Sequence, residues 1–457
     1  PYSIFYVDSF DVTYRRYYQS VADRAFVRGD ENTVITNDGF SGPDIFVFDL
    51  ANPRKPELIN ATTVDGEAGN YRVSFVPATP DRLYLAVNIE ASMAPVSMAP
   101  DTPSRLKRRR NRADYLVITP SELRETAERL ADYREGRALT TKVVELEDIY
   151  DEFNYGISNP EAIRDFLSYA YHKWRKAPRY VVLVGEGTYD YKDNQGYGDN
   201  LLPSMMVATP YGLFASDNHL VDVDGDDGVP DMAIGRLPVM TAEELDIFID
   251  KIMAYESAGG QWRKRTLMLA DDPDDGGDFP GDSDAVAALL PPEYAAEKVY
   301  LSEHTRDEAR QLVREGINNG ALFMNYIGHA GVDRLSKEGM LMESDVDSLT
   351  NGDKLPVMTA MTCVAGQFAI PGYDSLSEVL VLHQDGGAVA AWSPTGLSMN
   401  DQAVILDKAL FHAVFQDEER TLGDAVLKAL GDYSLSGTTS YMLDIYNLLG
   451  DPALEMR

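Results

Sequence analysis

The sequence predicts an α/β protein with a mostly parallel sheet covered by helices on both faces, preceded by a small β domain. Two observations support this prediction. After residue 112, short apolar runs alternate with amphipathic segments of helical length, which is the pattern of strands buried on both faces of a parallel sheet. Before residue 90, the strand-like segments are short, alternating and aromatic, with Gly, Pro and Asn between them, as expected for antiparallel β structure.

The N-terminal region contains the predicted β domain and a linker. Residues 1–90 form the β domain in this interpretation, because strand-like segments recur at 10–14, 44–49 and 71–75. Residues 91–112 are first rich in Ala, Met, Pro and Ser and then contain the basic run Lys107–Arg112, and they show no apolar periodicity. We interpret them as a solvated linker. For the basic run, a processing site for a peptidase that cleaves after basic residues is the alternative.

Residues 113–457 carry the alternating pattern in two series, which predict two subdomains. In the first, 113–258, strands are expected at 115–119, 142–146 and 180–184 and helices at 121–135, 160–175 and 241–255. Ser121 and Thr241 are expected to cap two of these helices. In the second, 259–457, strands are expected at 266–270, 298–301, 321–327, 356–362 and 387–392, with helices near 283–290, 306–318, 374–384 and 400–414. The strands form either two sheets side by side or one continuous sheet.

The charge balance limits the classes of partner. The chain has 74 acidic and 41 basic residues and a formal charge of −33, whereas a nucleic-acid surface needs clustered Lys and Arg. Nucleic acid is therefore not expected as a partner, and we expect a soluble protein that is secreted or held at the cell surface. No run of about 18 apolar residues exists, so no membrane span is predicted. The first residues lack the apolar core of a signal sequence, which indicates that the chain begins inside a longer precursor.

Polar residues follow four of the predicted strands. In open α/β sheets, ligands bind at the carboxyl ends of the strands. One strand runs into Gly328-His329-Ala330-Gly331 and the next into Cys363-Val364-Ala365-Gly366, while the other two are followed by Asp271-Asp272 and by Glu186. We expect these side chains to gather at one edge of the sheet.

Cys363 is the only cysteine, so no internal disulfide can form. A lone cysteine is most often a buried small hydrophobe, but a thiol with a nearby imidazole can act as a nucleophile. His329 is expected at the neighbouring strand end, and the small residues around both leave backbone N–H groups free to hold an oxyanion. The pair therefore predicts a nucleophile, Cys363, and its acid/base partner, His329.

These residues resemble the catalytic domain of gingipain-type cysteine peptidases, which have the caspase-like fold. The resemblance covers residues 113–457 and rests on Asn325–His329, Met361–Gly366, Ser375–Glu378, Pro230–Leu237 and Leu449–Leu454. It implies a caspase-like sheet, a dyad of His329 and Cys363, and an oxyanion hole built from the N–H groups of Ala330 and Cys363. The family often has glycine at the position of Ala330, which still donates its N–H but does not freely adopt positive φ.

The resemblance also implies carboxylates beside the dyad. An acidic residue in or after Asp271-Asp272 would assist the histidine or line the specificity pocket, and Asp282 is a further candidate. In relatives that cleave after Arg or Lys, a carboxylate at the pocket floor pairs with the substrate cation. A solvated acidic loop is the alternative for each of these residues. The β domain at 1–90 is then the remainder of a propeptide or an accessory module.

A second acidic loop is a candidate metal site. The loop carries carboxylates at Asp222, Asp224, Asp226 and Asp231, and two glycines lie between them. This spacing lets one loop wrap a hard cation. The loop is not an EF-hand, because its sixth position is Asp rather than Gly and Ala233 occupies its twelfth. The expected ion is a structural calcium, with a bare acidic turn as the alternative, and no organic cofactor is implied.

The sequence therefore predicts a cysteine endopeptidase that hydrolyses polypeptides through a thioester acyl-enzyme. Cleavage after a basic residue is the expectation from the resemblance. Two alternatives stay open, because a sortase-like transpeptidase would use the same dyad and a catalytically silent binding module would merely bury Cys363. A serine α/β-hydrolase is disfavoured, since the chain has no G-x-S-x-G motif.

Overall fold

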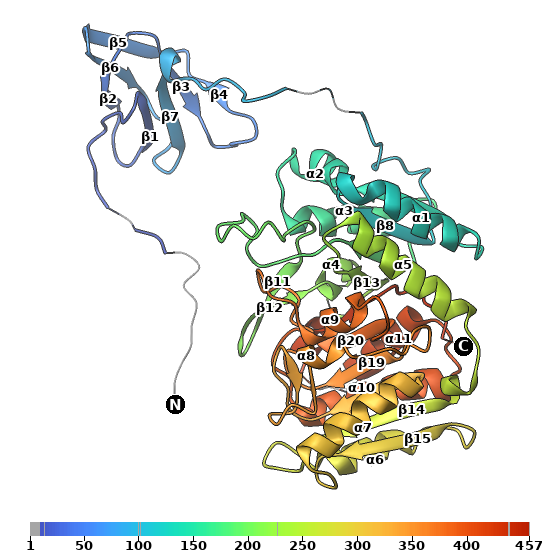
Figure 1. Cartoon of the computed structure of the whole chain (residues 1–457). Helices are drawn as coiled ribbons and strands as arrows, with labels where there is room; N and C mark the ends of the chain where they lie inside the picture. The colour runs from blue at the N-terminus through green and yellow to red at the C-terminus, as the bar shows by residue number, and fades with distance from the viewer. Residues whose placement is uncertain are drawn as a thin grey trace. The chain divides into compact units, whose positions relative to one another are not determined.

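The computed structural model of the chain contains two compact units, Pro1–Thr102 and Pro103–Arg457 (Figure 1). The structure describes residues 10–12, 14–98, 100, 102–225, 227–436 and 439–456. Among these residues, no helix is long and apolar enough to cross a membrane, as the sequence predicts.

The first unit is the predicted β domain. Its four-stranded sheet has the order β1 (Arg24–Arg28), β7 (Leu83–Asn88), β3 (Ile45–Asp49) and β4 (Glu57–Leu58), and its three-stranded sheet has the order β2 (Ile35–Phe40), β6 (Asn70–Phe75) and β5 (Thr62–Glu67). All pairings between these strands are antiparallel. Alternate residues such as Val47 and Val73 are buried in its core. The described residues of 10–14 are not in a strand, so that prediction was wrong.

The predicted linker ends earlier than residue 112. Leu106 is 1% exposed, and the indole N–H of Trp174 donates to its carbonyl at 2.9 Å. The Glu152 carboxylate accepts hydrogen bonds from the backbone N–H groups of Leu106 and Lys107 at 2.5 and 3.0 Å. The basic run Lys107–Arg112 therefore begins in a packed segment of the second unit, where the half-buried Glu152 accepts its first backbone amide.

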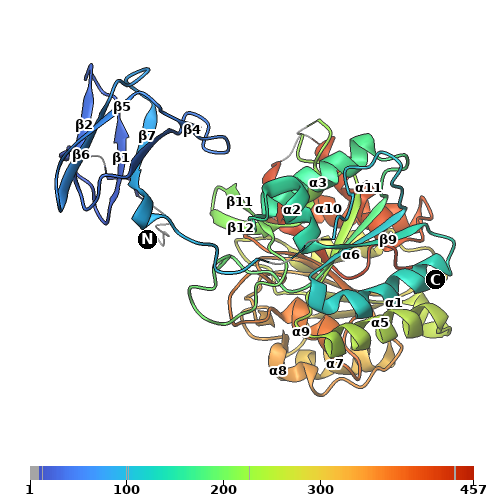
Figure 2. The same cartoon turned by 90° about the horizontal axis from the view of Figure 1, so that it is seen from above.

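The second unit is built on one continuous ten-stranded sheet, so of the two predicted arrangements the single sheet is correct. Helices cover both faces, with α1, α5, α7 and α9 on one and α2, α3, α10 and α11 on the other (Figure 2). The sheet order is β15 (Ala295–Tyr300), β14 (Arg265–Ala270), β16 (Phe323–Ile327), β19 (Val357–Met361), β20 (Ala390–Pro394), β21 (Tyr446–Leu449), β13 (Ala233–Leu237), β10 (Tyr180–Val184), β8 (Tyr115–Thr119) and β9 (Thr141–Glu145).

Most predicted helices are confirmed to within a few residues. The helices of the second unit are α1 (Arg124–Glu135), α2 (Leu146–Asn154), α3 (Pro160–Lys173), α4 (Asn218–Val221), α5 (Ala242–Ser257), α6 (Phe279–Ala287), α7 (Arg306–Asn319), α8 (Glu343–Val346), α9 (Leu376–Leu382), α10 (Asn400–Phe415), α11 (Leu422–Ser434) and α12 (Tyr441–Ile445). Thr241 caps α5 in a capping box, as expected. Ser121 does not cap α1, because a 3₁₀ turn over Ser121–Leu123 precedes that helix.

The sequence did not predict the strand that joins the two halves of the sheet. β21 pairs antiparallel with β20 and contacts β13 through Arg236 and Leu449. Asp451, just after β21, accepts hydrogen bonds from the Tyr115 hydroxyl at 2.9 Å and from Arg134 Nε at 2.8 Å. Two hairpins, β11 (Met205–Thr209) with β12 (Gly212–Ser216) and β17 (Arg334–Leu335) with β18 (Leu341–Met342), were also not predicted.

A buried polar cluster joins β16 and β19 to α10. Asn325 Nδ2 donates to the Thr359 hydroxyl at 2.9 Å and to both carboxylate oxygens of Asp407, at 2.7 and 2.8 Å. All three residues are fully buried. Burial raises the pKa of Asp407 to about 7, because desolvation disfavours the charged carboxylate.

We predict that Asp407→Asn gains stability relative to the wild-type protein as pH rises. A carboxyl pKa of about 7 in the folded state lies above the ordinary value of about 4, so the stability that Asp407 contributes below pH 4 is lost as pH rises to 7. The amide carries no charge at any pH. The unfolding free energy of the variant minus that of the wild-type protein should therefore increase by roughly 2–4 kcal/mol between pH 4 and pH 8.

Urea unfolding at several pH values measures this shift. Asp401→Asn, on the exposed side of the same helix, is the matched control and should show a constant difference from the wild-type protein. A difference for Asp407→Asn that does not change with pH would contradict the assignment.

Candidate active site

Three neighbouring parallel strands bring the candidate catalytic residues to one edge of the sheet. Ala270 of β14 pairs with Ile327 of β16, which in turn pairs with Met361 of β19. Because these rungs are in register, Asp271 follows the aligned ends by one residue, and His329 and Cys363 follow them by two. The register thus gives His329 and Cys363 equivalent positions on adjacent strands.

The loop between β14 and α6 surrounds the His329 ring. The Nε2 atom of His329 lies 3.0 Å from a carboxylate oxygen of Asp274. The ring also packs edge-on against Phe279, with 5.3 Å between the ring centroids. Hydrogen bonds from the Gly276 N–H and from His329 hold the pKa of Asp274 below its ordinary value. Asp274 is therefore a carboxylate partner of His329 that the sequence did not single out, because nothing distinguishes it from the other acidic residues of this loop.

Asp271 supports the backbone of His329 rather than its ring. Its side chain is buried at 3% exposure, and its Oδ2 atom accepts a hydrogen bond from the His329 N–H at 3.1 Å. Burial raises the pKa of Asp271 to about 6. Gly328 has a φ of +155°, and a Cβ atom there would lie 2.4 Å from the Asp271 Cβ. Only glycine therefore allows this close contact.

Asp272 has a different environment from the one expected. It is exposed, and its carboxylate lies with those of Asp271 and Glu338, all within 4.8 Å of one another. Among the interactions of the described residues, none joins the Asp272 side chain to His329. The sequence therefore located the acidic loop, but it did not identify which carboxylate contacts the histidine ring.

Cys363 is half-buried and its thiol contacts Ser398. The Ser398 N–H donates to Sγ at 3.4 Å, and the Ser398 carbonyl oxygen lies 3.6 Å from Sγ. Burial raises the pKa of the Cys363 thiol above its ordinary value, and the hydrogen bond from the Ser398 N–H offsets part of this effect. No hydrogen bond joins Cys363 to His329 within the described residues. Burial and the lack of a contact with His329 both favour the neutral thiol over a thiolate–imidazolium pair.

The backbone beside the thiol is strained and leaves two N–H groups free. Val364 has a φ of +45°, an outlier for a β-branched residue, and its N–H donates to the Gly396 carbonyl at 3.0 Å. Within the part of the chain that the structure describes, the N–H groups of Ala330 and Cys363 donate to no protein acceptor. Ala330 does not adopt positive φ, so replacing glycine with alanine imposes no strain at this position.

Asp282 lies in the first turn of α6, where its carboxylate accepts a hydrogen bond from Asn400 Nδ2 at 2.8 Å. Asn400 begins α10, two residues after the Ser398 that contacts the thiol. Asp282 is half-buried. A half-buried carboxylate held by one neutral amide keeps acceptor capacity for a cation.

The second acidic loop uses its carboxylates to fold itself. Asp231 Oδ2 accepts the N–H groups of Val223 and Asp224 at 2.8 and 2.7 Å, and Asp222 Oδ2 accepts the Gly228 N–H at 3.2 Å. The Asp222 Oδ1 atom is buried and has no hydrogen-bond partner among the described residues, so it could serve as one oxygen ligand. Asp226 lies outside the described residues. Calcium at this loop remains a prediction.

Residues 108–457 match the model of peptidase family C25. Gingipain R2 of Porphyromonas gingivalis strain W83 is 25% identical over 431 residues, which cover 88% of this chain and 53% of that protein. Lys-gingipain W83 of the same species is 26% identical over 163 residues, covering 34% of this chain and 9% of that protein. The chain thus spans about half the length of the first of these relatives.

Solved structures of the same kind share the fold. The crystal structure of the Arg specific cysteine proteinase gingipain R superposes with a TM-score of 0.64 at 22% identity, covering 78% of this chain and 80% of that one. The complex of the RgpB pro- and mature domains from Porphyromonas gingivalis gives a TM-score of 0.63 at 22% identity, with 76% and 80% coverage. The predicted caspase-like fold is therefore confirmed.

We predict that Cys363 alkylates with a pH midpoint above that of free cysteine. Burial and the absence of an imidazolium contact favour the neutral thiol, and only the thiolate reacts with iodoacetamide. Because the chain has one cysteine, the mass of the alkylated protein reports this site alone.

The rate should be measured from pH 5 to pH 10 beside free cysteine under the same conditions. Complete alkylation with a midpoint below pH 7 would mean that Cys363 is a thiolate paired with the imidazolium of His329 before substrate binds. Cys363→Ser is the control and should take up no label.

Proposed function

We propose that this chain, which belongs to peptidase family C25, is a cysteine-type endopeptidase that hydrolyses polypeptides through Cys363 and His329. The observation that supports this pair is their equivalent position, two residues beyond the paired Ile327 and Met361 of adjacent strands. An extended substrate lying across this strand edge meets both side chains together with the free N–H groups of Ala330 and Cys363.

The reaction proceeds through a thioester. His329 takes the thiol proton as Cys363 Sγ bonds to the scissile carbonyl carbon, and the two free N–H groups stabilise the oxyanion. The C–N bond then breaks, and the proton on His329 passes to the leaving amine. Water attacks the thioester while His329 accepts a proton from it, the C–S bond breaks, and the returned proton restores the thiol.

Asp274 and Asp271 act through His329 as positioning residues. The Asp274 carboxylate, 3.0 Å from Nε2, fixes the ring orientation and stabilises the imidazolium that forms during the reaction. Asp271 holds the backbone N–H of His329 at 3.1 Å. This division of roles fits their environments, since Asp274 is exposed beside the ring whereas Asp271 is buried against the His329 backbone.

A basic residue before the cut is the preferred substrate class in this proposal. Asp282 supplies the carboxylate that pairs with it, because it is half-buried, retains acceptor capacity and is bonded to Asn400 close to the thiol contact of Ser398. The formal charge of −33 also attracts basic segments of a substrate.

Three further assignments accompany this function as proposals. The N-terminal β unit is a propeptide or accessory module. The protein is secreted or displayed at the cell surface. A calcium ion at the Asp222–Asp231 loop, if bound, stabilises the fold and takes no part in the chemistry.

We predict that Cys363→Ala and His329→Ala each lower kcat/KM by at least about 1,000-fold on internally quenched peptides that contain Arg or Lys. Asp274→Asn should lower kcat about 10- to 100-fold with little change in KM, because a misoriented ring affects the chemical step.

Asp272→Asn is the matched control for Asp274→Asn, since Asp272 is an exposed carboxylate in the same loop without a contact to the ring, and it should retain activity. Equal rates for Cys363→Ala and the wild-type protein would refute the nucleophile. Incorporation of an added amine into the product would instead favour the sortase-like alternative.

We predict that Asp282→Asn removes the preference for a basic residue before the cut. The ratio of kcat/KM for Arg over norleucine at that position should fall about 10- to 100-fold, as expected for the loss of one charge-assisted pair. Asp275→Asn, an exposed neighbour in the preceding loop, is the control. An unchanged ratio in Asp282→Asn would assign the specificity to another residue.

A further inference from the structure

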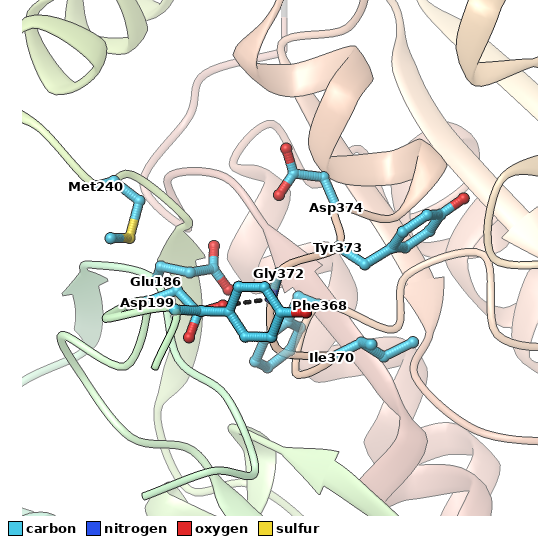
Figure 3. A pocket seen from close by; sticks show the side chains of 9 residues that line it. Glu186, Asp199, Met240, Phe368, Ile370, Gly372, Tyr373 and Asp374 are labelled. Carbon is cyan, nitrogen blue, oxygen red and sulfur yellow. Dashed lines mark hydrogen bonds between the residues drawn. The ribbon is translucent and has the colours of Figure 1, made fainter. Parts of the chain in front are cut away.

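A cavity of about 150 Å³ lies where the chain segment that begins at Cys363 meets the loop after β10 (Figure 3). The two segments are bonded to each other, because the Tyr189 N–H donates to the Ala369 carbonyl at 3.0 Å and the Gly372 N–H donates to Asp199 at 2.5 Å. The cavity is therefore built on the same segment as the proposed nucleophile.

Carboxyl and aromatic side chains line this cavity. Figure 3 shows Glu186 and Asp199 on one side and Asp374 and Tyr373 on the other. Phe368, at 1% exposure, and Glu186, at 7%, form its deep part, whereas Tyr197 and Tyr373 are 58% and 43% exposed at its mouth. No Lys, Arg or His is among the described residues that line it.

Arg236, the buried cation that stacks on Phe368, already donates hydrogen bonds to other acceptors. Arg236 donates to both carboxylate oxygens of Asp217, at 2.7 and 2.8 Å, and to the carbonyls of Gly185 and Leu202, at 2.8 and 2.7 Å. Its guanidinium therefore has little capacity left for the carboxyls of the cavity. The charge of Arg236 acts on Glu186 and Glu378 from behind, but no cationic side chain among the described residues lines the cavity itself.

The buried carboxyl of Glu378, behind the cavity, has another carboxyl as its neighbour. Glu378 is 1% exposed, and its Oε1 atom receives no hydrogen bond from a nitrogen or hydroxyl donor among the described residues. This carboxyl faces Glu186, which accepts a hydrogen bond from the adjacent Gly187 N–H at 3.1 Å and interacts with the charge of Arg236. Burial raises the pKa of Glu378 to about 7, and burial together with the neighbouring Glu378 raises that of Glu186. The two carboxyls therefore share a proton, and a cation beside Glu186 in the cavity would favour loss of that proton.

We propose that this cavity is a second specificity subsite, which binds a Lys or Arg side chain of the polypeptide substrate at a position apart from the scissile bond. The inference rests on the proposed endopeptidase function and adds a second basic residue to the substrate class. The carboxyls of Glu186, Asp199 and Asp374 accept hydrogen bonds from the cation, and the rings of Tyr197 and Tyr373 contact its apolar stem and its charge.

The shape of the site favours an organic cation over a metal ion. Among the described residues, the group of three acidic side chains whose oxygens lie within 4.8 Å of one another is Asp271, Asp272 and Glu338, and none of these lines the cavity. The cavity carboxyls are too far apart to coordinate a bare ion. A guanidinium has five donors in a plane and can reach separate acceptors at once.

The experiment uses the full chain and an internally quenched peptide with Arg before the cut and norleucine at the four positions on either side. Each norleucine is changed in turn to Arg. The expected result is that Arg at one of these positions lowers KM about 10-fold with kcat unchanged, as one buried charge-assisted contact would.

Asp374→Asn should abolish this preference without disturbing the fold, because Asp374 interacts with its neighbours through charge and forms no hydrogen bond to a described residue. Asp199→Asn should weaken it as well. Asp353→Asn is the matched control, since this exposed carboxylate precedes β19 whereas the cavity lies beyond the other end of that strand. Cleavage of the reference peptide, which has Arg before the cut and norleucine at every flanking position, measures folding for every variant.

The inference is overturned if the wild-type protein cleaves the reference peptide in a Cys363-dependent way but gains nothing from Arg at any flanking position. It is also overturned if Asp374→Asn keeps the wild-type preference. If no cleavage depends on Cys363, the proposed function itself is refuted, and the subsite proposal falls with it.

Discussion

The parallel pairing of β16 with β19 is the constraint on which the candidate active site depends. Ile327 and Met361 occupy the same rung, so His329 and Cys363 leave the sheet side by side. Every residue of both strands is buried. A shift of register by one residue would move all of these side chains to the opposite face, and the packed helices on both faces make that shift costly. The hydrophobic core therefore fixes the relative position of two polar residues that do not contact each other.

The loops beyond this rung adopt backbone conformations that the rest of the structure must stabilise. Val364 at positive φ costs on the order of 1–3 kcal/mol, and a buried carboxyl such as Asp271 adds a desolvation cost. Hydrogen bonds from Val364 to Gly396 and from His329 to Asp271 offset part of both. In the proposed reaction, the thiol of Cys363, whose pKa is raised by burial, loses its proton to His329.

Buried ion pairs join the two halves of the sheet. Arg134 bonds Asp451 and Glu256, and all three side chains are at most 1% exposed. The Arg134–Asp451 pair links α1 to the segment just after β21, and removing one partner would leave an uncompensated buried charge. A second buried pair, Arg236 with Asp217, lies within the first half, where Arg236 also donates to the Gly185 and Leu202 carbonyls of the loop after β10. The loop after β10 is thereby held close to the segment that follows Cys363.

The sequence by itself determined the α/β class, the antiparallel N-terminal unit, most of the helices and the two residues of the proposed dyad. These follow from local periodicity and from the small residues after two apolar strands, which are properties of short segments. The tertiary structure alone decided that the sheet is continuous through β21, that Asp274 rather than Asp271 or Asp272 contacts the His329 ring, and that Glu186, Asp199 and Asp374 share a cavity. Each of these depends on residues that are distant in the chain or alike in type, so no local pattern distinguishes them, and only packing brings them together.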